Sequence, residues 1–299
     1  MDSKTHQDVR DMVFFRWKPA AVLRVTGEDS FTFLQGQFSN DLRSLDRAED
    51  AVYGLWLNHK GRVIADSFIR RSGEEDFLVL SYFCTGQVIR ERLEAFVIAD
   101  DVLIEDVADK WRGLTVFGDS EGDSFLEMGG GSFAFRGRRS ASDHREYIFP
   151  IEFEAAVESR LAGGREVGTE EVERRRIADG IASVPFDIGP GELPNEGALE
   201  AAAISYTKGC YLGQEVMARL KSMGQVRRRL LRVQGSTPIP QTPASLFQGD
   251  RRIGEMRTQV PTAEGFIGLA LLSLLNLQRE TALSFTPGSD GVVSVMDIL

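Results

Sequence analysis

Short apolar runs, separated by turns rich in glycine and charged residues, dominate the first half of the chain. Runs of this kind are typical of β-strands, and they lie at 21–25, 51–57, 63–69, 77–80, 102–107 and 114–117. The turn Asn-His-Lys-Gly-Arg at 58–62 predicts a hairpin, because asparagine and glycine tolerate the positive φ values of a tight turn.

Apolar residues at helical spacing lie between several of these runs. Asp29 or Ser30 can cap a helix, because their oxygens accept the free amide hydrogens of its first turn. The buried stripe of this helix is predicted to comprise Phe31, Leu34, Phe38 and Leu42. Further helices are predicted after the capping residue Thr85, and over 151–161 and 169–179.

The pattern changes at about residue 226. Proline, glycine and glutamine separate short apolar segments at 226–233, 245–247, 252–256, 266–272 and 292–296. Such spacing is typical of a small antiparallel β-barrel or sandwich. The preceding segment Pro185–Pro194 holds three prolines and two glycines, which predicts an irregular loop. The chain is therefore predicted to be an α+β protein with antiparallel sheets.

Length and charge narrow the class of protein. A chain of 299 residues suggests two or three domains. It has 35 Lys and Arg against 45 Asp and Glu, a formal net charge of −10, which disfavours a broad basic face for nucleic acid. Its two cysteines and three histidines argue against a disulfide scaffold and against a metal site.

Two further segments bear on location. The first twenty residues are rich in charge and lack the apolar core of a signal peptide. The longest apolar segment, 266–277, contains Gly, Ser and Asn and falls short of the roughly 18 residues of a membrane span. We expect a cytoplasmic protein that does not enter a membrane.

One segment, Lys-Gly-Cys-Tyr-Leu-Gly-Gln-Glu at 208–215, has the features of a reactive site. Gly209 permits a sharp turn and Gly213 opens a predicted helix, so Cys210 lies just before a helix N-terminus. The helix dipole and the ammonium group of Lys208 both favour a thiolate. The alternative is that Cys210 is a small buried apolar residue beside a solvated lysine.

Positive charge is concentrated around this segment. Between residues 208 and 232, Glu215 is the one acid, and there are seven cations: Lys208, Arg219, Lys221, Arg227, Arg228, Arg229 and Arg232. A basic strip on an acidic protein suits a ligand with several carboxylates or phosphates. A strand edge kept basic to prevent aggregation is the alternative.

The segment at 208–215, followed by Ala218-Arg219, resembles the signature of the YgfZ-like folate-binding proteins. These are relatives of the glycine-cleavage T-protein and include mitochondrial factors for iron–sulfur protein maturation. Other segments resemble the same family, namely 33–41 (Phe-Leu-Gln-Gly-Gln-Phe-Ser-Asn-Asp), 57–62, 176–181, 193–196, 253–255 and 268–270. The resemblance thus spans residues 21–272.

The resemblance implies a three-part, ring-like T-protein-type fold with a ferredoxin-like insert and a C-terminal antiparallel β-barrel. A discontinuous folate-binding domain would comprise residues 1–50 and 145–225, and its second part would carry the cysteine segment. The insert would comprise residues 51–144 and the barrel residues 226–299. Tetrahydrofolate would lie in a central channel.

Two departures from the T-protein bear on activity. The T-protein carries adjacent aspartates after its first hairpin, one of which acts on the folate nitrogen, whereas this chain has Ala65-Asp66 there. A glutamate that grips the pterin is also missing, since Asp179 precedes Gly180. The T-protein in turn lacks the cysteine segment, so we favour the YgfZ-like branch. Asp66 is then either a folate contact or a carboxylate that caps a hairpin or faces solvent.

Cys210 is the predicted functional thiol, and Lys208 is predicted to favour its thiolate form. The residues predicted to hold the folate are Asp66, Asn40, Glu196, Tyr211, Gln214, Glu215, Arg219 and Arg228. The basic run 227–229 would take the polyglutamate tail, and no residue is predicted to bind a metal.

Three functions fit these features. The first is a tetrahydrofolate-binding accessory protein for the assembly or repair of iron–sulfur enzymes, with those enzymes or their assembly factors as partners. The second is a folate-dependent, aminomethyltransferase-like one-carbon transferase with Asp66 as base. The third is an interaction module that docks a protein or RNA through residues 227–229. We expect a monomer without direct nucleic-acid binding, and only an indirect effect on tRNA modification through iron–sulfur enzymes.

Overall fold

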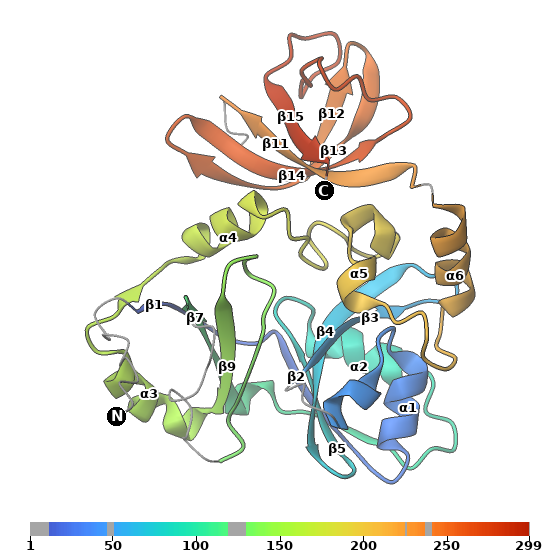
Figure 1. The fold of residues 1–299 in the computed structure, drawn as a ribbon, viewed down its shortest axis with the longest axis vertical. Helices are drawn as coiled ribbons and strands as arrows, with labels where there is room; N and C mark the ends of the chain where they lie inside the picture. Colours follow the sequence, from blue (N-terminus) through green and yellow to red (C-terminus); the bar gives the residue numbers. More distant parts are fainter. Residues whose placement is uncertain (1–11, 47–50, 119–129, 225, 237–240, 299) are drawn as a thin grey trace, which may run out of the picture.

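A computed structural model describes residues 12–46, 51–118, 130–224, 226–236 and 241–298. Most of the first twenty residues, on which the expectation of no signal peptide rests, therefore lie outside the described part. Three five-stranded sheets form the framework, two of them side by side with the third above them (Figure 1).

The first sheet, called the β4 sheet below, has the strand order β3-β4-β5-β2-β6. All its pairs are antiparallel. Its strands are β2 (Ala21–Thr26), β3 (Val52–Leu57), β4 (Val63–Gly73), β5 (Asp76–Ser81) and β6 (Leu103–Asp106). The predicted hairpin is confirmed, because β3 pairs with β4 and Gly61 in the turn has a positive φ of 66°.

The two faces of the β4 sheet have different surroundings. One face is covered by α1 (Ser30–Gln37), which packs on β5, and by α2 (Gly86–Glu94), which packs on β2, β4 and β6. Side chains alternate along a strand, so Asp66 and Phe68 share one face. That face looks toward the neighbouring sheet, since the Phe68 ring lies 4.6 Å from the ring of Phe135 in that sheet.

The second sheet, the β9 sheet, has the strand order β10-β1-β7-β9-β8. Its strands are β1 (Val13–Trp17), β7 (Trp111–Phe117), β8 (Phe133–Phe135), β9 (His144–Pro150) and β10 (Arg165–Glu166). The pair of β10 and β1 is parallel and the others are antiparallel. Helix α3 (Glu154–Leu161) packs on this sheet. Its Val157 and Leu161 form a core with Phe14 of β1 and Tyr147 of β9.

The third sheet is antiparallel and curls into a C-terminal half-barrel, as the spacing of its apolar segments predicts. Its order is β12-β13-β14-β11-β15. The strands are β11 (Arg228–Gly235), β12 (Ala244–Gln248), β13 (Arg251–Thr262), β14 (Gly265–Ser273) and β15 (Val293–Ile298). Side chains such as Leu231, Met256 and Phe266 form a core of its own.

Helix α1 is shorter than the predicted apolar stripe. It ends at Gln37, Phe38 is extended, and Leu42 begins a 3₁₀-helix (Leu42–Asp46). A side chain takes the place of the helical carbonyl here, because the Leu42 amide donates to Gln35 Oε1 (2.9 Å). Phe38 and Leu42 are both buried, so the stripe is apolar although it is not one helix.

The other predicted helices are present. Helix α2 starts after Thr85, whose hydroxyl accepts from the amide of Val88. Helix α4 (Thr169–Ala178) is followed by Gly180 at a φ of 68°, and the predicted irregular loop follows.

A buried ion pair joins α4 to this loop, and the same carboxylate reaches the barrel. Arg176 Nη1 lies 2.6 Å from Asp187 Oδ2, and both side chains are almost fully buried. Asp187 also accepts from the hydroxyls of Ser183 (2.7 Å) and Thr258 (2.6 Å). Because Thr258 belongs to β13, one carboxylate connects α4, the loop after it and the barrel.

The described residues contain neither a candidate membrane span nor a candidate metal-binding cluster. No helix among them is long and apolar enough to cross a membrane. Within the same ranges, no group of three or more His, Cys, Asp or Glu side chains is placed to hold a metal ion.

Candidate functional site

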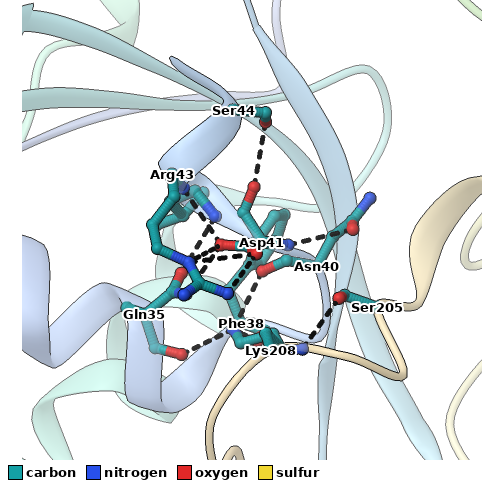
Figure 2. A network of polar contacts seen from close by, with 9 residues as sticks. Gln35, Phe38, Asn40, Asp41, Arg43, Ser44, Ser205 and Lys208 are labelled. Carbon is teal, nitrogen blue, oxygen red and sulfur yellow. Dashed lines mark hydrogen bonds and ion pairs between the residues drawn. The ribbon is translucent and has the colours of Figure 1, made fainter. Parts of the chain in front are cut away.

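The two motifs at 33–41 and 208–215 meet at the side chain of Lys208 (Figure 2). Its Nζ donates to the carbonyl oxygens of Gln35 (2.6 Å), Phe38 (2.7 Å) and Asn40 (2.8 Å). These carbonyls lie at and just beyond the C-terminal end of α1, where a cation is favoured by the helix dipole. One lysine thus satisfies backbone groups about 170 positions earlier in the chain.

Lys208 is almost completely buried, with 4% of its surface exposed. Burial lowers the pKa of its ammonium group to about 8, so the group is still charged at neutral pH. The sequence predicts that this ammonium favours the Cys210 thiolate, whereas its three hydrogen bonds are made to the α1 segment. Its clearest effect is therefore to hold the loop that carries Cys210.

The segment after α1 is itself braced by Asp41 (Figure 2). Its carboxylate accepts from Gln35 Nε2 (2.9 Å) and pairs with the Arg43 guanidinium (2.6 Å). The hydrogen bond from Arg43 holds the pKa of the Asp41 carboxyl well below its usual value, despite partial burial. Asp41 thus stabilises the turn whose backbone carbonyls accept the hydrogen bonds of Lys208.

Cys210 is exposed, two residues after Lys208. Helix α6 (Gln214–Met223) begins after Gly213, which has a φ of 90° and approaches the β3–β4 turn so closely that a Cβ would lie 2.9 Å from Asn58 O. The predicted helix start after Gly213 is confirmed, and Cys210 is not the small buried residue of the alternative interpretation.

The other residues of the cysteine segment divide between interior and surface. Tyr211 is buried, and burial raises the pKa of its hydroxyl to about 12. The Lys208 ammonium lies 5.3 Å from the centre of the Tyr211 ring, within range of a cation–π contact. On α6, Gln214 is half-buried and Glu215 and Arg219 are exposed.

Asp66 forms a second polar site, on the inward face of the β4 sheet. Its Oδ2 accepts from the Tyr53 hydroxyl (3.0 Å), and its Oδ1 accepts from Ser81 Oγ (3.0 Å) and lies 3.5 Å from Cys84 Sγ. Burial raises the pKa of the Asp66 carboxyl above its usual value, although these hydroxyl donors oppose the shift. Asp66 therefore neither caps the hairpin nor faces solvent.

Sequence reasoning missed Tyr53 and Ser81 as partners of Asp66. Alternation was a signal for Tyr53, which pairs with Phe68 and so lies on the face that carries Asp66. It was no signal for Ser81, because Leu80 pairs with Phe68 and alternation therefore assigns Ser81, the last residue of β5, to the other face. Cys84, which contacts the same carboxylate, is buried.

Asn40 links the two sites. Its Nδ2 donates to the carbonyls of Tyr53 (2.8 Å) and Ala202 (3.1 Å), and its Oδ1 accepts from the Asp41 amide. The backbone carbonyl of Asn40 also accepts a hydrogen bond from Lys208 Nζ. The side chain predicted to touch folate is thus engaged with backbone on both sides.

Glu196 and Arg228 are paired with each other. Arg228 Nε lies 2.8 Å from Glu196 Oε1, and its Nη2 lies 3.0 Å from Oε2. Glu196 also accepts from the Leu193 amide (2.9 Å), which makes it a helix-capping residue. The predicted basic strip is therefore interrupted, because Lys208 is buried and Arg228 is neutralised, while Arg219 and Arg227 are exposed.

In the folded protein at pH 8, iodoacetamide is expected to modify Cys210 and to spare Cys84. Burial raises the pKa of the Cys84 thiol to about 12, so only about one molecule in ten thousand carries that thiolate at pH 8. Peptide mass mapping after timed labelling measures both sites. Urea-unfolded protein, as control, should be labelled at both, and equal labelling of the folded protein would contradict the structure.

Comparison with known proteins supports the resemblance at the level of the T-protein superfamily. Residues 4–122 match the GCVT N-terminal domain family, and residues 227–295 match the CAF17 C-terminal β-barrel domain. The aminomethyltransferase T of the Bartonella henselae glycine cleavage system has the same fold, with a TM-score of 0.76 at 19% identity over 96% of this chain and 85% of that one. The predicted T-protein-type fold is thereby confirmed.

Three relatives identified by sequence share one name. The mitochondrial iron–sulfur cluster assembly factor IBA57 of Homo sapiens is 29% identical over 86% of this chain and 76% of its own length. The mouse protein is 26% identical with the same coverage, and the Mycosarcoma maydis homologue is 27% identical over 78% of this chain and 61% of its own.

These relatives also correct one expectation. The sequence predicts a cytoplasmic protein, and this is contradicted by the relatives, all three of which are named as mitochondrial. The chain is thus similar to the GCVT N-terminal domain family in its first part, to the CAF17 β-barrel domain in its last part, and to iron–sulfur cluster assembly factors over most of its length.

Proposed function

We propose that this chain is a tetrahydrofolate-binding accessory protein that supports the assembly or repair of iron–sulfur enzymes, with Cys210 as its functional thiol. The observation that carries the proposal is an exposed cysteine on a loop that a buried lysine holds to the body of the protein. The names of the relatives support the same class of process.

The chemistry of an exposed thiol suits this process. Cysteine thiolates are the usual protein ligands of iron–sulfur clusters. An accessible thiol can also exchange with a disulfide of a partner protein. Cys210 can serve either contact without opening the fold, because its loop is anchored through Lys208 and its side chain is exposed. The proposed partners are iron–sulfur enzymes or their assembly factors.

The Asp66 site is the proposed site for the ring of a folate. The pterin ring is planar and carries N–H donors. Asp66 offers a buried acceptor, and Tyr53 and Phe68 offer aromatic surfaces whose ring centres lie 5.0 Å apart. We propose that these residues hold the ring, and the bound folate supplies a carrier for one-carbon units. Asn40 and Glu196, whose side chains are engaged with the protein itself, act by positioning.

The alternative is a folate-dependent, aminomethyltransferase-like transferase with Asp66 as base. The observation in its favour is the raised pKa of the Asp66 carboxyl, which burial brings closer to the range of a general base. Against it, residue 65 is alanine, so the site has one carboxylate where the T-protein has two. Formation of methylenetetrahydrofolate from an aminomethyl donor would favour this alternative.

Cys210→Ala is expected to abolish function in cells that lack the wild-type protein while leaving the fold intact. The thiol is exposed, so its removal costs little packing, and surface substitutions usually change stability by less than about 0.5 kcal/mol. Activity of an iron–sulfur enzyme in the complemented cells measures function, and thermal unfolding checks the fold. Ser222→Ala on α6 is the matched control. Full rescue by Cys210→Ala would rule out a functional thiol.

Anaerobic calorimetric titration with tetrahydrofolate is expected to show saturable micromolar binding to the wild-type protein. Asp66→Asn should weaken binding about tenfold or more, because it replaces one carboxylate oxygen by a donor that faces a ring N–H. Asp76→Asn, a carboxylate on β5 paired with Arg24, is the control. No heat up to millimolar folate would contradict a folate-binding function.

A further inference from the structure

The hairpin between β8 and β9 is fixed against the Asp66 site. Gly137 permits this close approach, since a Cβ there would lie 2.6 Å from the Tyr82 hydroxyl and 2.4 Å from the Glu146 carboxylate. Arg139 follows, only 5% exposed, with its guanidinium 4.2 Å from the Tyr82 ring centre and 4.7 Å from that of Trp17. Although the composition of residues 136–145 suggests a loop, the backbone on either side of Arg138 is held in place.

Arg138 is thereby placed over Tyr53. Its guanidinium carbon lies 4.4 Å from the centre of the Tyr53 ring, and its amide faces the Tyr82 hydroxyl at 3.3 Å. Tyr53 donates its hydroxyl to Asp66, so a positive and a negative side chain flank one ring. Among the described residues, no carboxylate pairs with the Arg138 guanidinium and no hydrogen bond uses it.

An exposed aromatic ring lies beside the same site. Phe186 is 55% exposed, although large apolar side chains are mostly buried, and its ring centre lies 5.4 Å from that of Phe83. Phe83 precedes Cys84, whose sulfur lies 3.5 Å from both Asp66 Oδ1 and the carbonyl of Val184. The loop that carries Phe186 therefore reaches the Asp66 site and offers a surface on which a planar ring can stack.

We propose that Arg138 is a ligand-binding residue, which together with Asp66 recognises a planar heterocycle whose edge carries an N–H donor beside a carbonyl oxygen. Asp66 accepts from the N–H, and Arg138 donates to the oxygen. A guanidinium is suited to this task because its donors form a planar fork. The 2-amino-4-oxo edge of a pterin has this pattern, so the inference rests on the proposed folate binding and names the part of the folate that is read.

The test compares Arg138→Gln with Arg136→Gln, a neighbour that loses the same charge. Arg136 is half exposed, and its guanidinium pairs with the Asp143 carboxylate (3.0 Å). Calorimetry with tetrahydrofolate, dimethyltetrahydropterin and p-aminobenzoylglutamate separates the ring from the tail. Arg138→Gln is expected to weaken the first two ligands about tenfold or more, the usual effect of losing a charge-assisted hydrogen bond, and Arg136→Gln less than about twofold.

The outcomes distinguish this inference from the proposed function. Wild-type affinity of Arg138→Gln for tetrahydrofolate would overturn the inference and leave folate binding standing. A loss confined to p-aminobenzoylglutamate would also overturn it, because Arg138 would then bind the tail. No binding by the wild-type protein would contradict folate binding itself, and the inference with it. If thermal unfolding shows that Arg138→Gln is not folded, Arg138→Lys, which keeps the charge without the fork, is expected to weaken the ring ligands and serves as the test.

Discussion

The candidate functional loop depends on one buried ammonium group. The ammonium group of Lys208 is buried, and no carboxylate of the described residues forms an ion pair with it. Three backbone carbonyls at the end of α1 accept its hydrogen bonds instead. Burying a charge is costly unless it is fully hydrogen-bonded, so this arrangement persists only while α1 ends where it does. The early end of α1 is therefore a condition for this contact, and the contact in turn holds the loop that carries the exposed Cys210.

The same contact connects the cysteine loop with the Asp66 site. Asn40 receives Lys208 at its carbonyl and holds Tyr53 through its side chain, and Tyr53 in turn donates to Asp66. A ligand at Asp66 and a partner at Cys210 would thus act on one rigid part of the protein. This arrangement suits an accessory protein in which a bound folate and a thiol work on the same client, and it gives the proposed function a structural basis within one chain.

Local features were predictable from the sequence, and long-range contacts were not. The β3–β4 hairpin, the Thr85 cap and the start of α6 depend on residues close in sequence, so turn and capping residues reveal them. The role of Lys208 depends on carbonyls about 170 positions away, which no local pattern reports. The predicted basic strip is wrong at Arg228 for the same reason. This arginine pairs with Glu196, which lies 32 positions earlier in the chain. Asp66 was identified through a family resemblance, and its burial became clear only once three strands were placed around it.

Hydrogen exchange of Lys208→Met, with Lys221→Met as the matched control, tests the central role of the ammonium most directly. The substitution keeps the length and apolar stem of Lys208 but leaves three carbonyls without their donor. The amides of Ser205 and Leu42, which bond to Ser39 O and Gln35 Oε1, lie on the two joined segments. They are expected to exchange about ten to a hundred times faster in Lys208→Met, with the barrel strands β13 and β14 unchanged. Wild-type exchange at both amides would contradict the account, because the two segments would then be held together without the lysine.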